Sequence, residues 1–195
     1  MRSFRQPECS PGFLISLACI LLFLPLRWFL ALFISAAFHE LCHLLALRLC
    51  GGQVHQLRLG SFGAVIHATP LSPAKALLCS LAGPAGGLLL IFFARWFPRL
   101  ALCAAIQSAY NLLPIHGLDG SHALRFFLGM FLPEEVLIPL CIIIERILLI
   151  LVCSLALYAT FIVRLGILPV LAAGSLILKA TGGKIPCKTG SLRVQ

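Results

Sequence analysis

Apolar runs long enough to cross a lipid bilayer recur along almost the whole chain. Of its 195 residues, 61% are hydrophobic and only 11% are charged, a composition that soluble globular domains do not have. No polar stretch between the runs is long enough to form a separate soluble domain. We therefore predict an all-α polytopic membrane protein, with one membrane-embedded domain over residues 1–178 and a basic tail over residues 179–195.

The charge distribution supports a membrane location and argues against nucleic acid as a partner. The net charge is +9, and the Lys and Arg residues lie at segment ends and in the tail. This pattern is typical of membrane proteins whose orientation is set by positive charges on the cytoplasmic side and whose basic residues attract anionic lipid. No basic, aromatic-bearing soluble surface exists to bind nucleic acid. We expect both termini on the cytoplasmic side, and the nine cysteines, which show no paired spacing, to be free thiols.

The apolar pattern predicts about six transmembrane helices, because a crossing takes about 20 residues. We expect the short first segment to be retained rather than removed as a signal peptide. Part of the fifth segment, residues 134–146, is an alternative candidate for a helix lying along the interface. The predicted segments are approximately 13–26, 28–49, 73–93, 100–131, 136–163 and 165–178.

Two stretches depart from this helical pattern. Residues 53–69 alternate apolar and polar side chains around a glycine-containing turn, which predicts a small β-hairpin after the second helix. The fourth helix is interrupted between Asn111 and Gly120, where Pro114 and Gly117 fall. Irregular backbone at membrane depth is tolerated only beside protein or a water-filled cavity. This break therefore marks a candidate functional region.

The second apolar segment contains a metal-binding motif, His-Glu-Leu-Cys-His, at residues 39–43. On a helix, positions i and i+4 share a face, so His39 and His43 can hold one Zn²⁺ while Glu40 acts as a general base. Zinc with an open position lowers the pKa of bound water to about 7. A chance match is the alternative, but ionisable residues inside a bilayer are costly and persist mainly where they have a function.

Catalytic zinc usually takes a third protein ligand, which must come from elsewhere in the chain. Asp119, the sole aspartate, lies in the broken fourth segment, and a carboxylate in an apolar interior needs a partner such as a dication. His116 and His122 are rival ligands. A helix cap after the Pro-Gly break is the alternative role of Asp119. We predict Asp119 as the third ligand.

Together these residues resemble the site-2 protease family of intramembrane zinc metalloproteases. The family pattern, H-E-x-x-H followed by N-x-x-P-x-x-x-x-D-G, matches residues 39–43 and then Asn111, Pro114 and Asp119-Gly120. The resemblance covers residues 28 to about 130. The compact form, without a PDZ insertion or a CBS domain, is most similar to the bacterial branch that processes sporulation factors, the stage IV FB type.

The resemblance implies a role for each matched position. His39, His43 and Asp119 would bind one Zn²⁺ per chain, Glu40 would be the catalytic base, and Asn111 and Pro114 would belong to the substrate or oxyanion site. The hairpin would offer a strand edge to an unwound substrate. The implied partners are a membrane-protein substrate, the lipid bilayer and a regulatory membrane partner. The implied location is the bacterial cytoplasmic membrane.

Two positions depart from the family pattern. Cys42 stands where glycine is frequent, and its thiol could either compete for zinc or pack between helices; we favour packing. Gly87 replaces the asparagine of the family's G-P-x-x-N element, which begins here at Gly83-Pro84. The polar role of that asparagine would be absent or supplied by another group such as Gln107. Close helix packing is the preferred role of the glycine-rich run.

These observations predict a zinc-dependent intramembrane endopeptidase that cleaves a transmembrane or membrane-adjacent segment of a substrate protein. A metal-binding membrane protein without hydrolysis would not need Glu40 beside its ligands. A catalytically silent scaffold would not need the intact His-Glu-His-Asp set. A serine protease of the rhomboid type would need a Gly-x-Ser nucleophile with a distant His, and no such arrangement is evident.

Overall fold

The computed structural model describes residues 8–9, 11, 14, 18, 20–22, 24–60, 63–69, 71–164, 166–182 and 192–194. The predicted first span, residues 13–26, is described only in part, because residues 13, 15–17, 19 and 23 lie outside this set. The described elements, in chain order, are mainly helical, with short strands after the first long helix and near both termini.

Helix α2, Leu26–Leu49, carries the metal-binding motif. Every fourth residue of one face is buried: Ala31, Ser35, His39, His43 and Leu47. The helix ends where Gly51 adopts a positive φ of 81°. There the Gly52 N–H donates to the Leu47 carbonyl at 2.9 Å and the Gly51 N–H to the Arg48 carbonyl at 3.0 Å. These are the two hydrogen bonds of a Schellman motif, which explains why the chain stops the helix at Gly51-Gly52.

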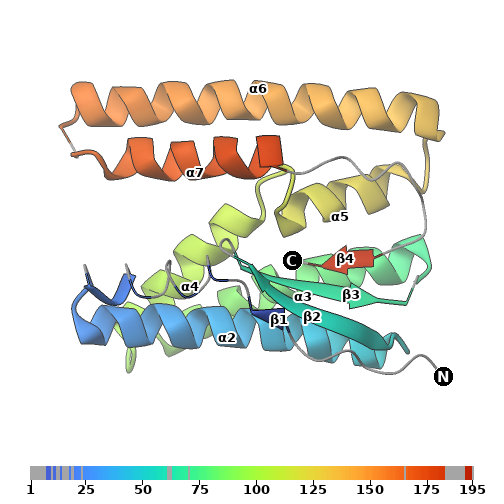
Figure 1. The fold of residues 1–195 in the computed structure, drawn as a ribbon, viewed down its shortest axis with the longest axis horizontal. Helices are drawn as coiled ribbons and strands as arrows, with labels where there is room; N and C mark the ends of the chain where they lie inside the picture. Colours follow the sequence, from blue (N-terminus) through green and yellow to red (C-terminus); the bar gives the residue numbers. More distant parts are fainter. Residues whose placement is uncertain are drawn as a thin grey trace.

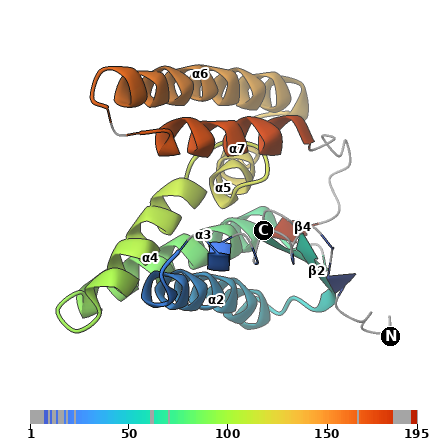
Figure 2. The ribbon, with the colours of Figure 1, turned by 60° about the vertical axis from the view of Figure 1, so that its left-hand side comes forward.

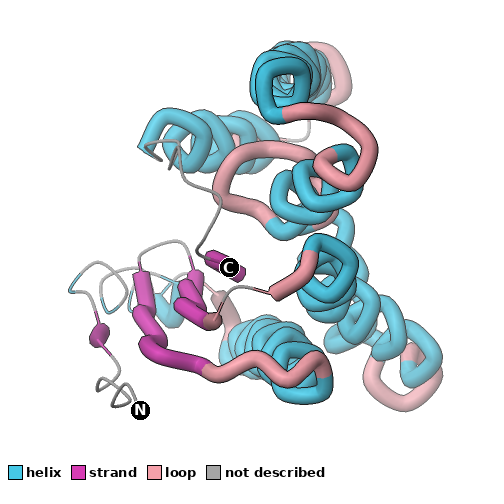
Figure 3. The backbone as a smooth tube through the Cα atoms, turned by 90° about the vertical axis from the view of Figure 1, so that its right-hand side faces the viewer, coloured by secondary structure: helices cyan, strands magenta, loops and turns pink. Residues whose placement is uncertain are grey.

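The four strands form one sheet, in which they are ordered β1-β2-β3-β4. Strands β2, Val54–Gly60, and β3, Gly63–Ala68, are antiparallel neighbours, with an irregularity between Val54 and Gln56. Strand β1, Glu8–Cys9, pairs in parallel with β2, and strand β4, Leu192–Val194, pairs antiparallel with β3. The strands gather at one edge of the helical assembly (Figure 3). Both outer edges of the β2–β3 pair are therefore partly occupied by terminal segments of the same chain.

Three α-helices follow the β2–β3 pair in the chain, and the first two of them pack on α2. Helix α3, Pro73–Leu89, continues as a 3₁₀ helix, η1, Leu90–Phe93, and packs on α2. Helix α4, Pro98–Asn111, contacts both α2 and α3, and helix α5, Asp119–Leu128, contacts α3. Residues 112–118, between α4 and α5, are not helical. The predicted break in the fourth segment is confirmed, and it leaves Asp119 as the first residue of a new helix.

The last two helices form a separate layer. Helix α6, Glu134–Phe161, is continuous and lies beside helix α7, Leu168–Gly182. In two views this pair lies on the opposite side of α5 from α2 and α3 (Figures 1 and 2). Helix α7 extends four residues beyond the predicted domain end at residue 178.

Within the described residues, three helical stretches are long and apolar enough to cross a membrane: Leu26–Leu49, Pro73–Phe93 and Glu134–Phe161. A shorter apolar helix covers Pro169–Thr181. These stretches coincide with the second, third, fifth and sixth predicted segments. They indicate an integral membrane protein.

Candidate metal site

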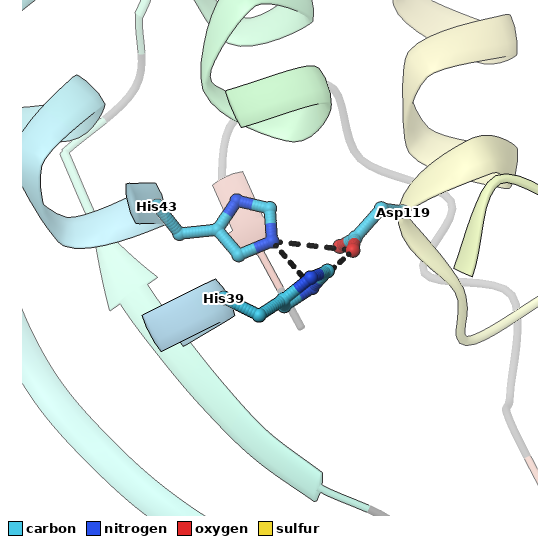
Figure 4. A group of neighbouring side chains, drawn as sticks. All are labelled: His39, His43 and Asp119. Carbon is cyan, nitrogen blue, oxygen red and sulfur yellow. Dashed lines mark hydrogen bonds and ion pairs between the residues drawn. The ribbon is translucent and has the colours of Figure 1, made fainter. Parts of the chain in front are cut away.

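Three side chains from two distant parts of the sequence converge inside the helical assembly. The Nε2 atom of His39 lies 3.0 Å from Oδ2 of Asp119, and Nε2 of His43 lies 3.2 Å from the same oxygen. The two Nε2 atoms are 3.2 Å apart. Figure 4 shows the two imidazoles, from α2, facing the carboxylate at the start of α5. All three residues are buried, and they form a group that could hold a metal ion.

The helix α2 positions both histidines, and its neighbour α3 fixes one of them. His39 and His43 are four residues apart on the buried face, which brings their rings into edge contact at a centroid separation of 4.8 Å. The Nδ1–H of His43 donates to the backbone carbonyl of Cys79 at 2.7 Å. Because one ring nitrogen donates, the other is left with its lone pair, as metal-binding histidines require.

Asp119 is placed by the turn that precedes it. Gly117 has a positive φ of 83°, which reverses the chain just before α5. Gly120 lies so close to the carbonyls of Leu112 and Leu113 that a Cβ would collide with both. The structure therefore explains the Asp-Gly pair. Gly120 lets the first turn of α5 pack against the loop, and the Asp119 side chain points toward the two histidines. At a helix N-terminus its negative charge is also favoured by the helix dipole.

The donor set fits a divalent metal. Ligands in a tetrahedral zinc site with bonds of about 2.0–2.2 Å lie about 3.3–3.6 Å apart, close to the 3.0–3.2 Å separations seen here. Oδ1 of Asp119 and Nδ1 of His39 are buried without a hydrogen-bond partner among the described residues. Two imidazole nitrogens and a carboxylate oxygen are ligands that zinc accepts.

Gly83 leaves the space that the imidazoles occupy. A Cβ built at this position would overlap Nε2 of His43 and would lie 2.7 Å from Nε2 of His39. Helix packing is the role predicted from the sequence for Gly83-Pro84, and the packing partner at Gly83 is the metal-site face of α2.

We expect Gly83→Ala to weaken metal binding strongly, because its methyl group displaces both imidazoles. Alanine favours helices over glycine by about 1 kcal/mol, so lost helix propensity would not explain the defect. The measurement is the zinc content of purified protein after dialysis against a buffered zinc solution. Gly174→Ala is the matched control, because nothing lies within 4 Å of its Cβ position. Equal zinc content in both variants and the parent would contradict this assignment.

Glu40 and Asn111, predicted from the sequence, both lie at the site. The Glu40 carboxylate interacts electrostatically with both imidazoles and with Asp119, and its Oε2 atom is buried without a hydrogen-bond partner among the described residues. The side-chain nitrogen of Asn111 lies 3.2 Å from Nε2 of His39. Pro114 lies in the non-helical segment between α4 and α5 and makes no hydrogen bond that reaches the three candidate ligands.

The rival ligands lie elsewhere. Among the described residues, the metal-site group contains neither His116 nor His122. Cys42 also stays outside this group, because its sulfur packs against Gly86 on α3. At Gly87, the space for a Cβ is filled by the Ser108 hydroxyl. Both departures from the family pattern are thus sites of close packing between helices.

Two polar groups near the site, the Lys179 ammonium and the Ser35 hydroxyl, were missed. Lys179, assigned to the tail, belongs to α7; its ammonium lies 5.5 Å from the centre of the Tyr110 ring and interacts electrostatically with Glu40 and Asp119. The Ser35 hydroxyl donates to Oε1 of Gln107 at 2.8 Å, one helical turn from the His39–Asn111 contact. The four-residue spacing of both pairs along α2 and α4 could have indicated this second contact.

The structure resembles a known protein although the sequence does not match one. No protein-family model matches the sequence, and no curated protein matches it. The site-2 protease from Methanocaldococcus jannaschii superposes with a TM-score of 0.63 over 97% of this chain and 98% of that one, at 19% identity. The chain has the fold of a site-2 protease. The site-2 protease fold implied by the sequence motifs is thereby confirmed, and the buried His-His-Asp group lies within it.

Proposed function

We propose that this chain is a zinc-dependent intramembrane endopeptidase that cleaves a transmembrane or membrane-adjacent segment of another protein. The observation that carries the proposal is the buried convergence of His39, His43 and Asp119, with the Glu40 carboxylate beside them. The fold shared with a site-2 protease supports it.

The residues around the site suit peptide hydrolysis. Zinc, when bound, supplies a Lewis acid that makes a water molecule acidic near neutral pH. Glu40 accepts the proton from the attacking water at its Oε2 atom, which has no hydrogen-bond partner in the part of the chain that the structure describes, and passes it to the leaving amine. Asn111, whose amide lies beside His39, donates a hydrogen bond to the developing oxyanion. Pro114 shapes the loop beside which the substrate backbone lies.

The substrate would be recognised as an extended strand. A helical substrate hides its carbonyls in hydrogen bonds to the residue four positions on, so it must unwind before attack. Addition to a strand edge stabilises an extended peptide through backbone hydrogen bonds. The outer side of β3 offers such an edge over residues 63–65, whereas residues 66–68 already pair with β4. A substrate strand that uses this part of the edge must displace the C-terminal residues.

Removing the C-terminal strand is therefore expected to speed cleavage. A chain ending at Gly190 lacks β4, and its cleavage rate at low substrate concentration should rise about two- to fivefold. This factor corresponds to removing a pairing of β4 with β3 that is worth about 0.5–1 kcal/mol and competes with the substrate. The measurement is the initial rate with a fixed substrate in proteoliposomes. Arg193→Ala is the control, because it keeps the backbone pairing. An unchanged or slower rate in the truncated chain would rule out competition by β4.

We propose about six crossings with both termini in the cytoplasm, counting the first predicted segment and the short helices α4–α5 and α7 together with the three long ones. The location is a cytoplasmic membrane of bacterial type, and the partners are a membrane-protein substrate, the bilayer and a regulatory membrane protein.

The test compares cells that produce the parent chain with cells that produce Glu40→Gln, at equal levels. Quantitative proteomics of membrane and soluble fractions should find at least one fragment, cut in or beside an apolar segment, that appears only with the parent. If both cell lines yield the same fragments although the purified parent holds zinc, the protein is a metal-binding scaffold and not a protease.

A further inference from the structure

Helix α6 contacts the loop that precedes Asp119. Residues 112–118 form the only connection between α4 and α5, and Asp119 follows them directly. Ile115 and Leu118 of this loop are fully buried and form a cluster with Leu176 of α7, against which three partly buried residues of α6 also pack. The three α6 residues are Leu148, Leu149 and Val152.

Glu145 continues this contact face of α6. It precedes Leu148, Leu149 and Val152 by three, four and seven positions, so all four side chains lie on one side of the helix. Its Oε1 atom accepts a hydrogen bond of 2.9 Å from the backbone N–H of His116. Among the described residues, no cation lies within ion-pairing distance of this carboxylate. Its partner is therefore the backbone of the loop.

This hydrogen bond satisfies a donor that no acceptor within the loop satisfies in the structure. The other donating N–H groups of the loop bond to carbonyls of α4 or of the loop, whereas the His116 N–H bonds to a different helix. The residues whose N–H groups bond within α4 and the loop are Leu112, Leu113, Ile115 and Leu118. An N–H without a partner away from water costs about 1–3 kcal/mol, and the part-buried hydrogen bond to Glu145 gives the His116 N–H its partner.

We infer that Glu145 is a positioning residue for the metal site, fixing the loop so that the carboxylate of Asp119 meets both imidazoles. The inference rests on the proposed metal site. His116 is three residues before Asp119, and functional constellations tolerate displacements of only about 0.5 Å. A loop released from α6 would move the carboxylate away from His39 and His43 while leaving the histidines on α2 unchanged.

The geometry requires an acceptor at position 145 rather than a charge. Gln has an oxygen at the same reach, so Glu145→Gln should keep the hydrogen bond. Asp is one methylene shorter and keeps the charge but cannot reach the His116 N–H. Leu removes the acceptor and, being apolar, is better suited to a membrane helix, so poorer insertion would not explain a loss.

The test is zinc affinity, measured on purified full-length variants in detergent by competition with a chromophoric chelator. The visible absorption spectrum of the Co²⁺-loaded protein provides a second readout of ligand geometry. We expect Glu145→Gln to match the parent in both. We expect Glu145→Leu to bind zinc roughly 10–100-fold more weakly, the usual cost of removing a group that supports a ligand, with an altered Co²⁺ spectrum. Glu145→Asp should fall between them.

The matched control is Arg146→Leu, which removes the neighbouring charge from an exposed position of α6 and should leave zinc affinity unchanged. Parent-like affinity and spectrum in Glu145→Asp and Glu145→Leu would overturn the inference. Should the Leu variant fail to fold, the Asp and Gln variants alone decide, because equal affinities in those two would also overturn it. A parent that binds no metal would instead contradict the proposed function.

Discussion

Replacing Glu40 by Gln is expected to abolish cleavage while zinc stays bound. The Gln side chain keeps the volume and polarity of Glu40, which is not one of the three candidate ligands, but it cannot accept the proton from water. Loss of a general base typically lowers a rate by about 10²–10⁴-fold. The measurement is the initial cleavage rate of a reconstituted substrate, together with zinc content of the same preparation.

The control for this experiment is Glu135→Gln, an equivalent change at an exposed position near the start of α6. It should cleave at the parent rate. Cleavage by Glu40→Gln at the parent rate would remove Glu40 from the mechanism. Loss of zinc together with loss of activity would show instead that Glu40 supports the metal site rather than proton transfer.

Replacing Asp119 by Asn is expected to remove both zinc and activity. The Asp119 carboxylate lies 3.0 Å from His39 Nε2 and 3.2 Å from His43 Nε2, and Asn would leave only two neutral nitrogen ligands beside a weakly donating amide oxygen. Zinc affinity should fall by at least about 100-fold, the upper end of what loss of a supporting group costs. The lost interaction with the α5 dipole costs only about 0.3–1 kcal/mol, too little to unfold the chain.

The measurement for Asp119→Asn is zinc affinity by chelator competition, with a thermal melt to confirm folding. His116→Ala is the control, because it removes a rival imidazole but keeps the backbone N–H that bonds to Glu145. Full zinc retention by a folded Asp119→Asn variant would move the third ligand elsewhere. Zinc loss in His116→Ala alone would make that imidazole the ligand.

Much of the site could be predicted because it depends on local periodicity. Helical spacing alone places His39 and His43 on one face. The break at Pro114 and Gly117 leaves Asp119 at the start of a helix, where the structure places it. The functional pattern was readable because ionisable groups are rare inside apolar runs, so each one is informative.

The supporting contacts could not be predicted, because they join residues far apart in the sequence. The Cys79 carbonyl that orients His43 is a backbone group, so no residue type in the sequence indicates this contact. Gly83 looks like any glycine of a helix-packing run until α2 is placed against it. Lys179 follows an apolar run and was read as the first residue of a tail, whereas α7 continues through it to Gly182.

X-ray absorption at the zinc K-edge of the purified chain tests the central claim most directly, that His39, His43 and Asp119 together bind one metal ion. We predict about one zinc per chain, with nitrogen and oxygen neighbours at about 2.0–2.2 Å and no sulfur neighbour at about 2.3 Å. Absence of stoichiometric zinc, or a sulfur shell that would place Cys42 on the metal, would contradict it.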